Sequence, residues 1–228
     1  MQAIVLADGD AGTRDRLDAT WPGWARPDAL VIAADGGARH AVGLGLRIER
    51  WVGDGDSLGE AGVAELIAAG IRVERAPPDK DESDTELAVL TACGLGADEL
   101  VILGALGGAR VDHALANVAL LGLPELMGLD VRLLAADARL RQLHGPGADG
   151  AAAHLDLEGR VGDLVTLLPV GEDAEGVTTR GLRFALDDEP LRVGRTRGLS
   201  NVRTARLARV TLRQGRILIV ETPATLPP

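Results

Sequence analysis

Short apolar runs alternate with amphipathic segments along the first 140 residues of the chain. The apolar runs, several of which end in Asp-Gly turns, are typical of buried parallel strands. They lie at 3–7, 29–34, 50–54, 72–77, 99–106 and 130–136. The segments at 37–46, 60–70, 83–96 and 112–126 have the apolar spacing of helices. Alternating strands and helices predict a mostly parallel sheet with helices on both faces.

The pattern changes near residue 140. Beyond it the chain consists of short alternating segments bounded by Gly, Pro and Asp, at 162–170, 174–186, 190–194, 208–215 and 216–222. Such segments are typical of an antiparallel β domain, a small sandwich or a barrel. We therefore expect an α/β protein with two domains. Residues 1–140 form the parallel-sheet domain, and residues 141–228 form a smaller, sandwich-like all-β domain.

Composition excludes several classes of protein. Hydrophobic residues make up 46% and charged residues 25% of 228 residues, as in globular proteins. Charges and a proline interrupt the longest apolar region, and the first residues lack a basic signal segment, so we expect a cytoplasmic protein without membrane spans. The net charge of −10 argues against a general nucleic-acid binder, although arginines outnumber acids over 180–216. A single cysteine, Cys93, excludes a disulfide framework.

Two aspartates follow the expected strand at 50–54, in the sequence "GDGDS". Asp54 and Asp56 lie one residue apart among glycines, where two like charges repel each other. A solvated Asp-Gly turn is one interpretation. The other is a magnesium site, because Mg²⁺ binds one or two carboxylates together with phosphate oxygens. Ligands of open parallel sheets bind at the carboxyl ends of the strands, where this motif lies.

A denser acidic motif, "PPDKDESDTELA" at 77–88, precedes the helix expected at 83–96. Its five acids surround the only lysine of the chain, Lys80. Acids in the first turn and a Ser83 or Asp84 cap explain part of the motif, since the helix dipole favours negative charge there. A helix start needs fewer than five acids for its cap and first turn. A cation shared with "GDGDS" would relieve their repulsion, and Lys80 could contact a phosphate.

Two glycine-rich turns complete the set of strand-end motifs. In "GGARVDH", a turn precedes a helix whose free N–H groups can bind an anion, and Arg110 can clamp phosphate oxygens. A surface pair of Arg110 and Asp112 is the simpler interpretation, and His113 is more often a structural residue than a catalyst. In "AADGGARHA", Asp35 ends a strand. One such motif is weak support for a ligand site, but four at the same edge of one sheet indicate a site.

Read in order, "ADGGA", "GDGDS", "DKDESDTE" and "GGARVDHALAN" resemble the thiamin pyrophosphokinase family. The likeness continues through "GDLVTLLPV", "GVTTRGLRFAL" and "GLSN", and so covers nearly the whole chain. The resemblance implies an α/β ATP-binding catalytic domain and a β-sandwich domain for thiamin binding and dimerisation. It also implies a homodimer that transfers the pyrophosphoryl group of ATP to the hydroxyl of thiamin, with Mg²⁺, leaving AMP.

The resemblance implies roles for residues that match the family's motifs. Magnesium ligands are Asp54, Asp56 and Asp84; nucleotide or phosphate contacts are Lys80, Ser83, Arg110 and Asp112; Asp35 shapes the substrate pocket; and Ser200 and Asn201 line the thiamin or nucleotide site. Asp81 and Asp112 are both possible acceptors of the alcohol's proton, and the sequence does not choose between them. Phe184 stands where the family often has Trp or Tyr, in a chain with few aromatic residues.

Three alternatives stay open at the level of sequence. The acceptor could be another small alcohol, such as a hydroxymethylpterin, on the same nucleotide domain. The chain could be a non-catalytic regulator that binds a metal or a nucleotide. The arginine-rich segment could form a nucleic-acid-binding surface, which the acidic total disfavours.

Overall fold

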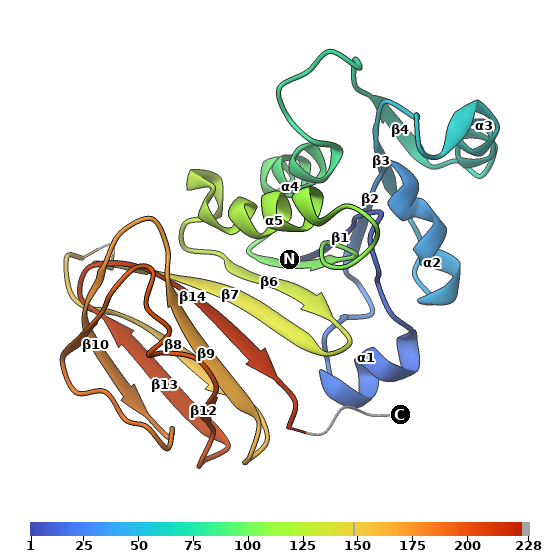
Figure 1. The fold of residues 1–228 in the computed structure, drawn as a ribbon. Helices are drawn as coiled ribbons and strands as arrows, with labels where there is room; N and C mark the ends of the chain where they lie inside the picture. Colours follow the sequence, from blue (N-terminus) through green and yellow to red (C-terminus); the bar gives the residue numbers. More distant parts are fainter. Residues whose placement is uncertain (148, 225–228) are drawn as a thin grey trace. The chain divides into compact units, whose positions relative to one another are not determined.

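A computed structural model describes residues 1–147 and 149–224 (Figure 1). The chain forms two compact units, the first of which is Met1–Ala136, while the second begins at Asp137. The domain boundary expected after residue 140 falls inside a strand of the second unit, Ala138–Gly145. None of the helices within the described ranges combines the length and the apolar character needed to cross a membrane.

Parallel strands form the sheet of the first unit, in the order β6-β5-β1-β2-β3-β4. They are β1 Gln2–Leu6, β2 Leu30–Ala34, β3 Arg50–Gly53, β4 Arg72–Arg75, β5 Glu99–Leu103 and β6 Asp130–Ala135. Every residue of β1 and of β5 is buried, as expected for central strands that are covered on both faces. The predicted parallel α/β arrangement is confirmed.

Helices and 3₁₀ turns connect these strands (Figure 1). They are α1 Arg14–Thr20, η1 Asp35–Arg39, α2 His40–Gly43, α3 Gly59–Ala68, α4 Asp84–Gly94, α5 Val111–Ala119, η2 Leu120–Gly122 and η3 Pro124–Leu126. The helix expected over 112–126 is divided into α5, η2 and η3, and Pro124 accounts for the break at Leu123, whose backbone is extended. Helix α4 packs on β1, β2 and β3, so its first residue lies near the ends of those strands.

The second unit is antiparallel. Its strands are β7 Ala138–Gly145, β8 Ala153–Glu158, β9 Leu164–Pro169, β10 Ala174–Arg180, β11 Glu189–Leu191, β12 Asn201–Val202, β13 Leu207–Leu212 and β14 Gly215–Thr222. They pair in two groups, β12-β9-β14-β7 and β11-β10-β13-β8. One apolar core joins the two groups, with Val165 and Ile217 from the first and Val177 and Val210 from the second.

A buried carboxylate holds three arginines together within this second unit. Glu221, 3% exposed, accepts hydrogen bonds from Arg139 at 2.7 Å, Arg141 at 3.0 Å and Arg203 at 2.7 Å. Burial opposes ionisation of Glu221, but the three guanidinium groups outweigh it and hold the pKa of the carboxyl below its usual range. The cluster ties β14 to β7 and to the chain that follows β12.

Acids within the unit neutralise much of the arginine-rich segment. Arg192 pairs with Asp173 at 2.9 Å, and Arg209 with Asp156 at 2.6 Å. Arg213 lies 2.8 Å from Asp188. These arginines, one on β13 and two in the adjoining turns, therefore belong to ion pairs rather than to a continuous basic surface.

Candidate functional site: a carboxylate trio at the strand ends

Three carboxylates converge at the carboxyl edge of the parallel sheet. Asp35 follows β2, Asp54 follows β3 and Asp84 is the first residue of α4. One ligand oxygen of each lies within 4.8 Å of the others. The parallel order β2-β3 brings the first two together, and the packing of α4 across β1, β2 and β3 adds the third. We refer to Asp35, Asp54 and Asp84 as the carboxylate trio.

Asp35 is the most buried member of the trio, at 3% exposure. Its carboxylate accepts hydrogen bonds from the backbone N–H groups of Ser57 at 2.8 Å and Leu58 at 3.2 Å. Its backbone has a φ of 38°, in the left-handed region that is costly for a residue with a Cβ. Trp51 donates its indole N–H to the Asp35 carbonyl at 3.0 Å, which helps to hold this conformation. Asp35 therefore fixes the loop that carries Asp54.

Burial raises the pKa of Asp35. The two backbone hydrogen bonds lower this pKa, and the nearby side chain of Asp56 raises it, so that the net shift is upward. Asp56 itself is exposed, and its Oδ1 accepts the hydroxyl hydrogen bond of Ser57 at 3.1 Å. The three carboxylate oxygens that lie within 4.8 Å of one another thus include one from Asp35, which the family resemblance makes a residue that shapes the substrate pocket. Asp56, expected as a ligand, lies beside this set.

Lys80 bridges the other two members of the trio. Its Nζ lies 2.9 Å from Asp84 Oδ1 and 3.5 Å from Asp54 Oδ2. Burial disfavours the ammonium form, but Asp84 and Asp54 outweigh this and raise the pKa of Lys80. A backbone hydrogen bond from Asp56, at 3.0 Å, lowers the pKa of Asp54. Desolvation raises the pKa of Asp84 in spite of the hydrogen bond and the charge of Lys80.

The remaining candidates of the first unit lie on exposed turns. Ser83 caps α4, and its Oγ accepts the N–H of Glu86 at 3.1 Å, while Asp81 is exposed two residues earlier. Arg110 donates to Asp112 at 2.9 Å, at the start of α5. That bidentate pair holds the pKa of Asp112 well below its usual range. The surface Arg110–Asp112 pair is present in this structure, and the guanidinium keeps further donors for a ligand.

In the second unit, Ser200 is exposed and has a φ of 55°, and its N–H donates to Thr166 Oγ1 at 3.0 Å. Asn201 is buried at 6% exposure. Its side-chain amide is hydrogen-bonded to the backbone of Phe184.

One contact that joins three strand-end loops was not predicted from the sequence. Arg39, in η1, lies with Nη1 3.1 Å from Oδ1 of Asp8, just after β1. Its Nη2 donates to the carbonyl oxygen of Ser57, in the loop after β3. The repeated sequence Ala-Asp-Gly, at 7–9 and 34–36, was the available signal, because it places Asp8 at a strand end in the same way as Asp35.

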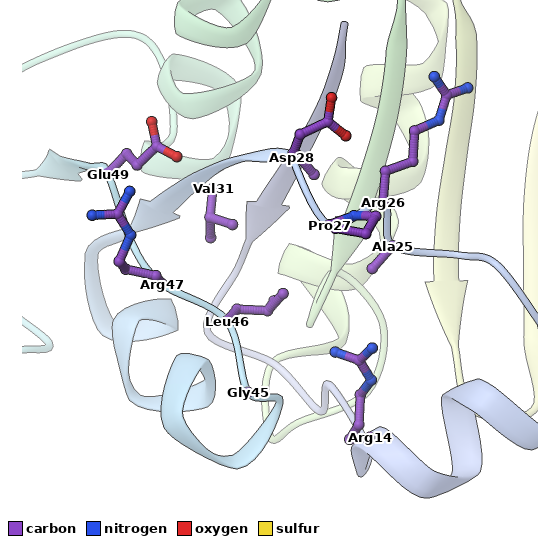
Figure 2. Close-up of a pocket in the computed structure, with 11 residues that line it drawn as sticks. Arg14, Ala25, Arg26, Pro27, Asp28, Val31, Gly45, Leu46, Arg47 and Glu49 are labelled. Atoms are coloured by element: carbon purple, nitrogen blue, oxygen red, sulfur yellow. The ribbon is translucent and has the colours of Figure 1, made fainter.

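A separate pocket of about 470 Å³ lies at the opposite, amino ends of β2 and β3 (Figure 2). Figure 2 shows Arg14, Arg26 and Arg47 around it together with Asp28 and Glu49. Its lining therefore carries both signs of charge. Because the trio lies at the carboxyl ends of the same strands, the pocket is not an extension of the trio.

Comparisons with known proteins agree over both units. Residues 24–129 match the family description "Thiamin pyrophosphokinase, catalytic domain". Residues 153–217 match "Thiamin pyrophosphokinase, vitamin B1 binding domain". The trio lies inside the first match, and Phe184, Ser200 and Asn201 lie inside the second.

A thiamine pyrophosphokinase of Bacillus subtilis is 26% identical over 192 residues, which are 84% of this chain and 86% of the relative. Among solved structures, thiamine pyrophosphokinase from Bacillus subtilis has a TM-score of 0.82 at 21% identity, with 99% of this chain and 100% of that chain covered. The Candida albicans enzyme has a TM-score of 0.78 at 12% identity, with coverage of 97% and 90%. The structures show a shared fold, and the matches to both domains together with the curated relative show that the chain belongs to the thiamin pyrophosphokinase family and is an enzyme of that kind.

Proposed function

We propose that this enzyme transfers the pyrophosphoryl group of ATP to the hydroxyl of thiamin with the help of Mg²⁺, giving thiamin diphosphate and AMP. The observation that carries the metal-dependent part is the carboxylate trio, whose oxygens lie within 4.8 Å of one another. The matches to a catalytic and a vitamin B1 binding domain support the substrates.

The donor set of the trio fits magnesium. Asp35, Asp54 and Asp84 offer hard oxygen atoms, which Mg²⁺ prefers to nitrogen or sulfur. Lys80 is the cation that bridges the cluster, and one ammonium does not balance three carboxylates. We propose that Asp54 and Asp84 are the main ligands, with Asp35 beside them and Asp56 within reach on the same loop. When bound, the ion neutralises phosphate oxygens and makes the attacked phosphorus more electrophilic.

Positively charged side chains of the chain would bind and orient the triphosphate. Pyrophosphoryl transfer needs positioning and charge neutralisation more than covalent chemistry. Lys80 is held between Asp54 and Asp84, so that it can donate to a phosphate oxygen without a change of backbone. Arg110 is exposed at the start of α5 and can clamp two oxygens.

The proton of the thiamin hydroxyl needs an acceptor. Because Arg110 strongly stabilises the ionised form of Asp112, that carboxylate is a weak base. We propose that Asp112 orients Arg110 toward the phosphates. Of the two candidates from the sequence, Asp81 then remains for the proton.

We propose that the second unit is a β-sandwich that binds thiamin and takes part in a homodimer, with the domain division near residues 136–140. Phe184 supports the binding role, because it is 61% exposed whereas Trp21, Trp24 and Trp51 are at most 8% exposed. The chain contains no tyrosine and no other phenylalanine. Phe184 is thus the one aromatic side chain with a free surface on which a heterocycle could stack.

The test mixes the protein with ATP, Mg²⁺ and thiamin and identifies the products by chromatography. Thiamin diphosphate and AMP in equal amounts are expected. ADP as the nucleotide product would contradict pyrophosphoryl transfer. AMP formation with a hydroxymethylpterin but not with thiamin would contradict the acceptor. ATP binding without turnover on either acceptor would indicate a regulator instead.

A further inference from the structure

The side chain of Asn201 pairs with the backbone of Phe184 in both directions. Its Oδ1 accepts the N–H of Phe184 at 2.9 Å, and its Nδ2 donates to the carbonyl oxygen of Phe184 at 2.7 Å. The same Oδ1 accepts the N–H of Val202 at 2.9 Å. Asn201 thus binds the peptide groups of Phe184 as a neighbouring strand would.

These contacts occupy most of the hydrogen-bonding capacity of the amide. An amide oxygen has two acceptor sites, and both are filled by backbone N–H groups. One of the two amide N–H groups is also used, and the side chain is 6% exposed. Three of the four hydrogen-bonding positions of the Asn201 amide are therefore used on the protein backbone.

The segment that Asn201 holds is also fixed on either side of Phe184, because Leu182 and Leu186 are buried and the N–H of Leu186 donates to Thr179 Oγ1 at 2.9 Å. Phe184 lies between β10 and β11 and belongs to no strand. Adjacent backbone bonds join Arg183 N to the Val202 carbonyl oxygen at 2.8 Å and pair Leu182 with Arg203. Asn201 adds the contacts that continue this pairing by one residue, as far as the exposed phenyl ring.

An exposed phenylalanine gains little from packing and would sample several orientations without support. The guanidinium carbon of Arg183 lies 5.5 Å from the ring centroid, and the side chain is still 61% exposed. Fixing the backbone beneath such a ring reduces the entropy that is lost when a ligand stacks on it. The arrangement has the form of a pre-organised stacking surface.

We propose that Asn201 is a positioning residue that fixes Phe184 for stacking on the aromatic ring of the acceptor and does not itself contact the acceptor. The proposal rests on the proposed function in that the acceptor is thiamin. It differs from the role implied by the family resemblance, in which Asn201 lines the ligand site.

A fluorescent reporter at position 184 tests this inference separately from turnover. The three native tryptophans are buried, so the full-length Phe184→Trp variant gains one exposed indole whose emission can be followed. Thiamin, titrated without ATP, is expected to quench this emission in a saturable manner. In the Phe184→Trp background, Asn201→Ala is expected to raise the dissociation constant of thiamin about tenfold, which is the size of effect that the loss of one or two hydrogen bonds produces. In the otherwise native chain, Asn201→Ala should raise KM for thiamin, while KM for ATP stays within about twofold of the native value.

Gln2→Ala is the matched control for loss of a buried amide. Gln2 is 2% exposed, its Nε2 donates to the Trp24 carbonyl at 3.2 Å and its Oε1 accepts the N–H of Arg26 at 2.7 Å, near the amino ends of the parallel strands. We expect it to lower the thermal midpoint without changing thiamin binding. Should Asn201→Ala fold poorly, Asn201→Asp keeps the two accepting contacts and removes the donor to Phe184.

The outcomes separate the two proposals. Unchanged thiamin affinity in both Asn201 variants would overturn the positioning role. Equal loss of thiamin and ATP binding, or an equal effect of Gln2→Ala, would also overturn it, because a structural defect would then explain the data. Absence of quenching in an active Phe184→Trp enzyme would overturn the stacking surface, whereas the identity of the products tests the reaction independently.

Discussion

The guanidinium of Arg39 lies with Nη1 3.1 Å from Oδ1 of Asp8. The other end of the guanidinium binds the backbone carbonyl of Ser57, so that one side chain connects the loops after β1, β2 and β3. We expect Arg39→Met to lower kcat/KM for ATP about tenfold, because the loop that carries the carboxylates proposed to bind Mg²⁺ would lose its support and small misplacements of reacting groups are costly. Arg39→Lys should recover part of the loss, since the charge near Asp8 remains. Steady-state kinetics with varied ATP measures both.

The control for Arg39 is Arg209→Met in the second unit. Arg209 is likewise an exposed arginine, and it forms a bidentate pair with Asp156 at 2.6 and 2.7 Å. Surface pairs of this kind contribute little to stability, so we expect near-native kinetics. Equal losses in both variants would mean that Arg39 has no specific effect on the site.

Asp84→Asn separates function from stability. We expect turnover to fall by about two orders of magnitude or more, because the proposed Mg²⁺ site would lose a charged ligand. Burial raises the pKa of Asp84, which means that its ionised form is disfavoured in the folded apo-protein. In the presence of EDTA, the thermal midpoint of the variant should therefore equal or exceed that of the native chain. A large fall in the apo-protein midpoint would show that Asp84 is a structural residue.

Magnesium should stabilise the native chain in a manner that depends on the trio. A ligand that binds only the folded state adds RT ln(1 + [L]/Kd) to its stability, about 2.7 kcal/mol at a hundred times Kd. We expect Mg²⁺ to raise the thermal midpoint of the native protein, and to raise that of Asp54→Asn much less. Thermal scans with increasing Mg²⁺ at constant ionic strength measure the difference. Identical increases would place the ion at another site.

The location of the candidate site could be predicted from the sequence because it depends on local order. Asp35 and Asp54 directly follow apolar runs, and parallel strands place their carboxyl ends at one edge of the sheet. Which carboxylates meet depends on long-range contacts. Asp35 joins Asp84 because α4 packs across β1, β2 and β3, and no local pattern encodes that packing. The same limit hid Arg39, whose partner Asp8 is 31 residues away.

The sequence predicted the presence of most helices and strands better than it predicted the residues at which they begin and end. The 112–126 segment keeps helical spacing through Leu120, yet α5 ends at Ala119. Helix α1 was not predicted, because seven residues rich in Arg and Asp give a weak apolar pattern. Its stability depends on the Thr13 cap and the buried Leu17, which are small local signals. In the second unit, the family resemblance implies that Asn201 lines the ligand site. In the folded chain its side-chain amide is hydrogen-bonded to the backbone of Phe184.

Glu221 gives the clearest pH dependence of stability. Its pKa is lower in the folded chain than in the unfolded chain, so its stabilising contribution is fully present above the ordinary glutamate pKa of about 4.3 and is lost as the pH falls below that value toward the lowered one. Glu221→Gln removes the charge that three buried or half-buried arginines share, and leaving such charges unpaired costs about 3 kcal/mol or more. We expect urea unfolding at pH 7 to show that loss. Between about pH 5 and pH 3 the variant should lose stability less steeply than the native chain, because it no longer takes up a proton at position 221 on unfolding. Parallel slopes for the two proteins would mean that Glu221 does not titrate with folding.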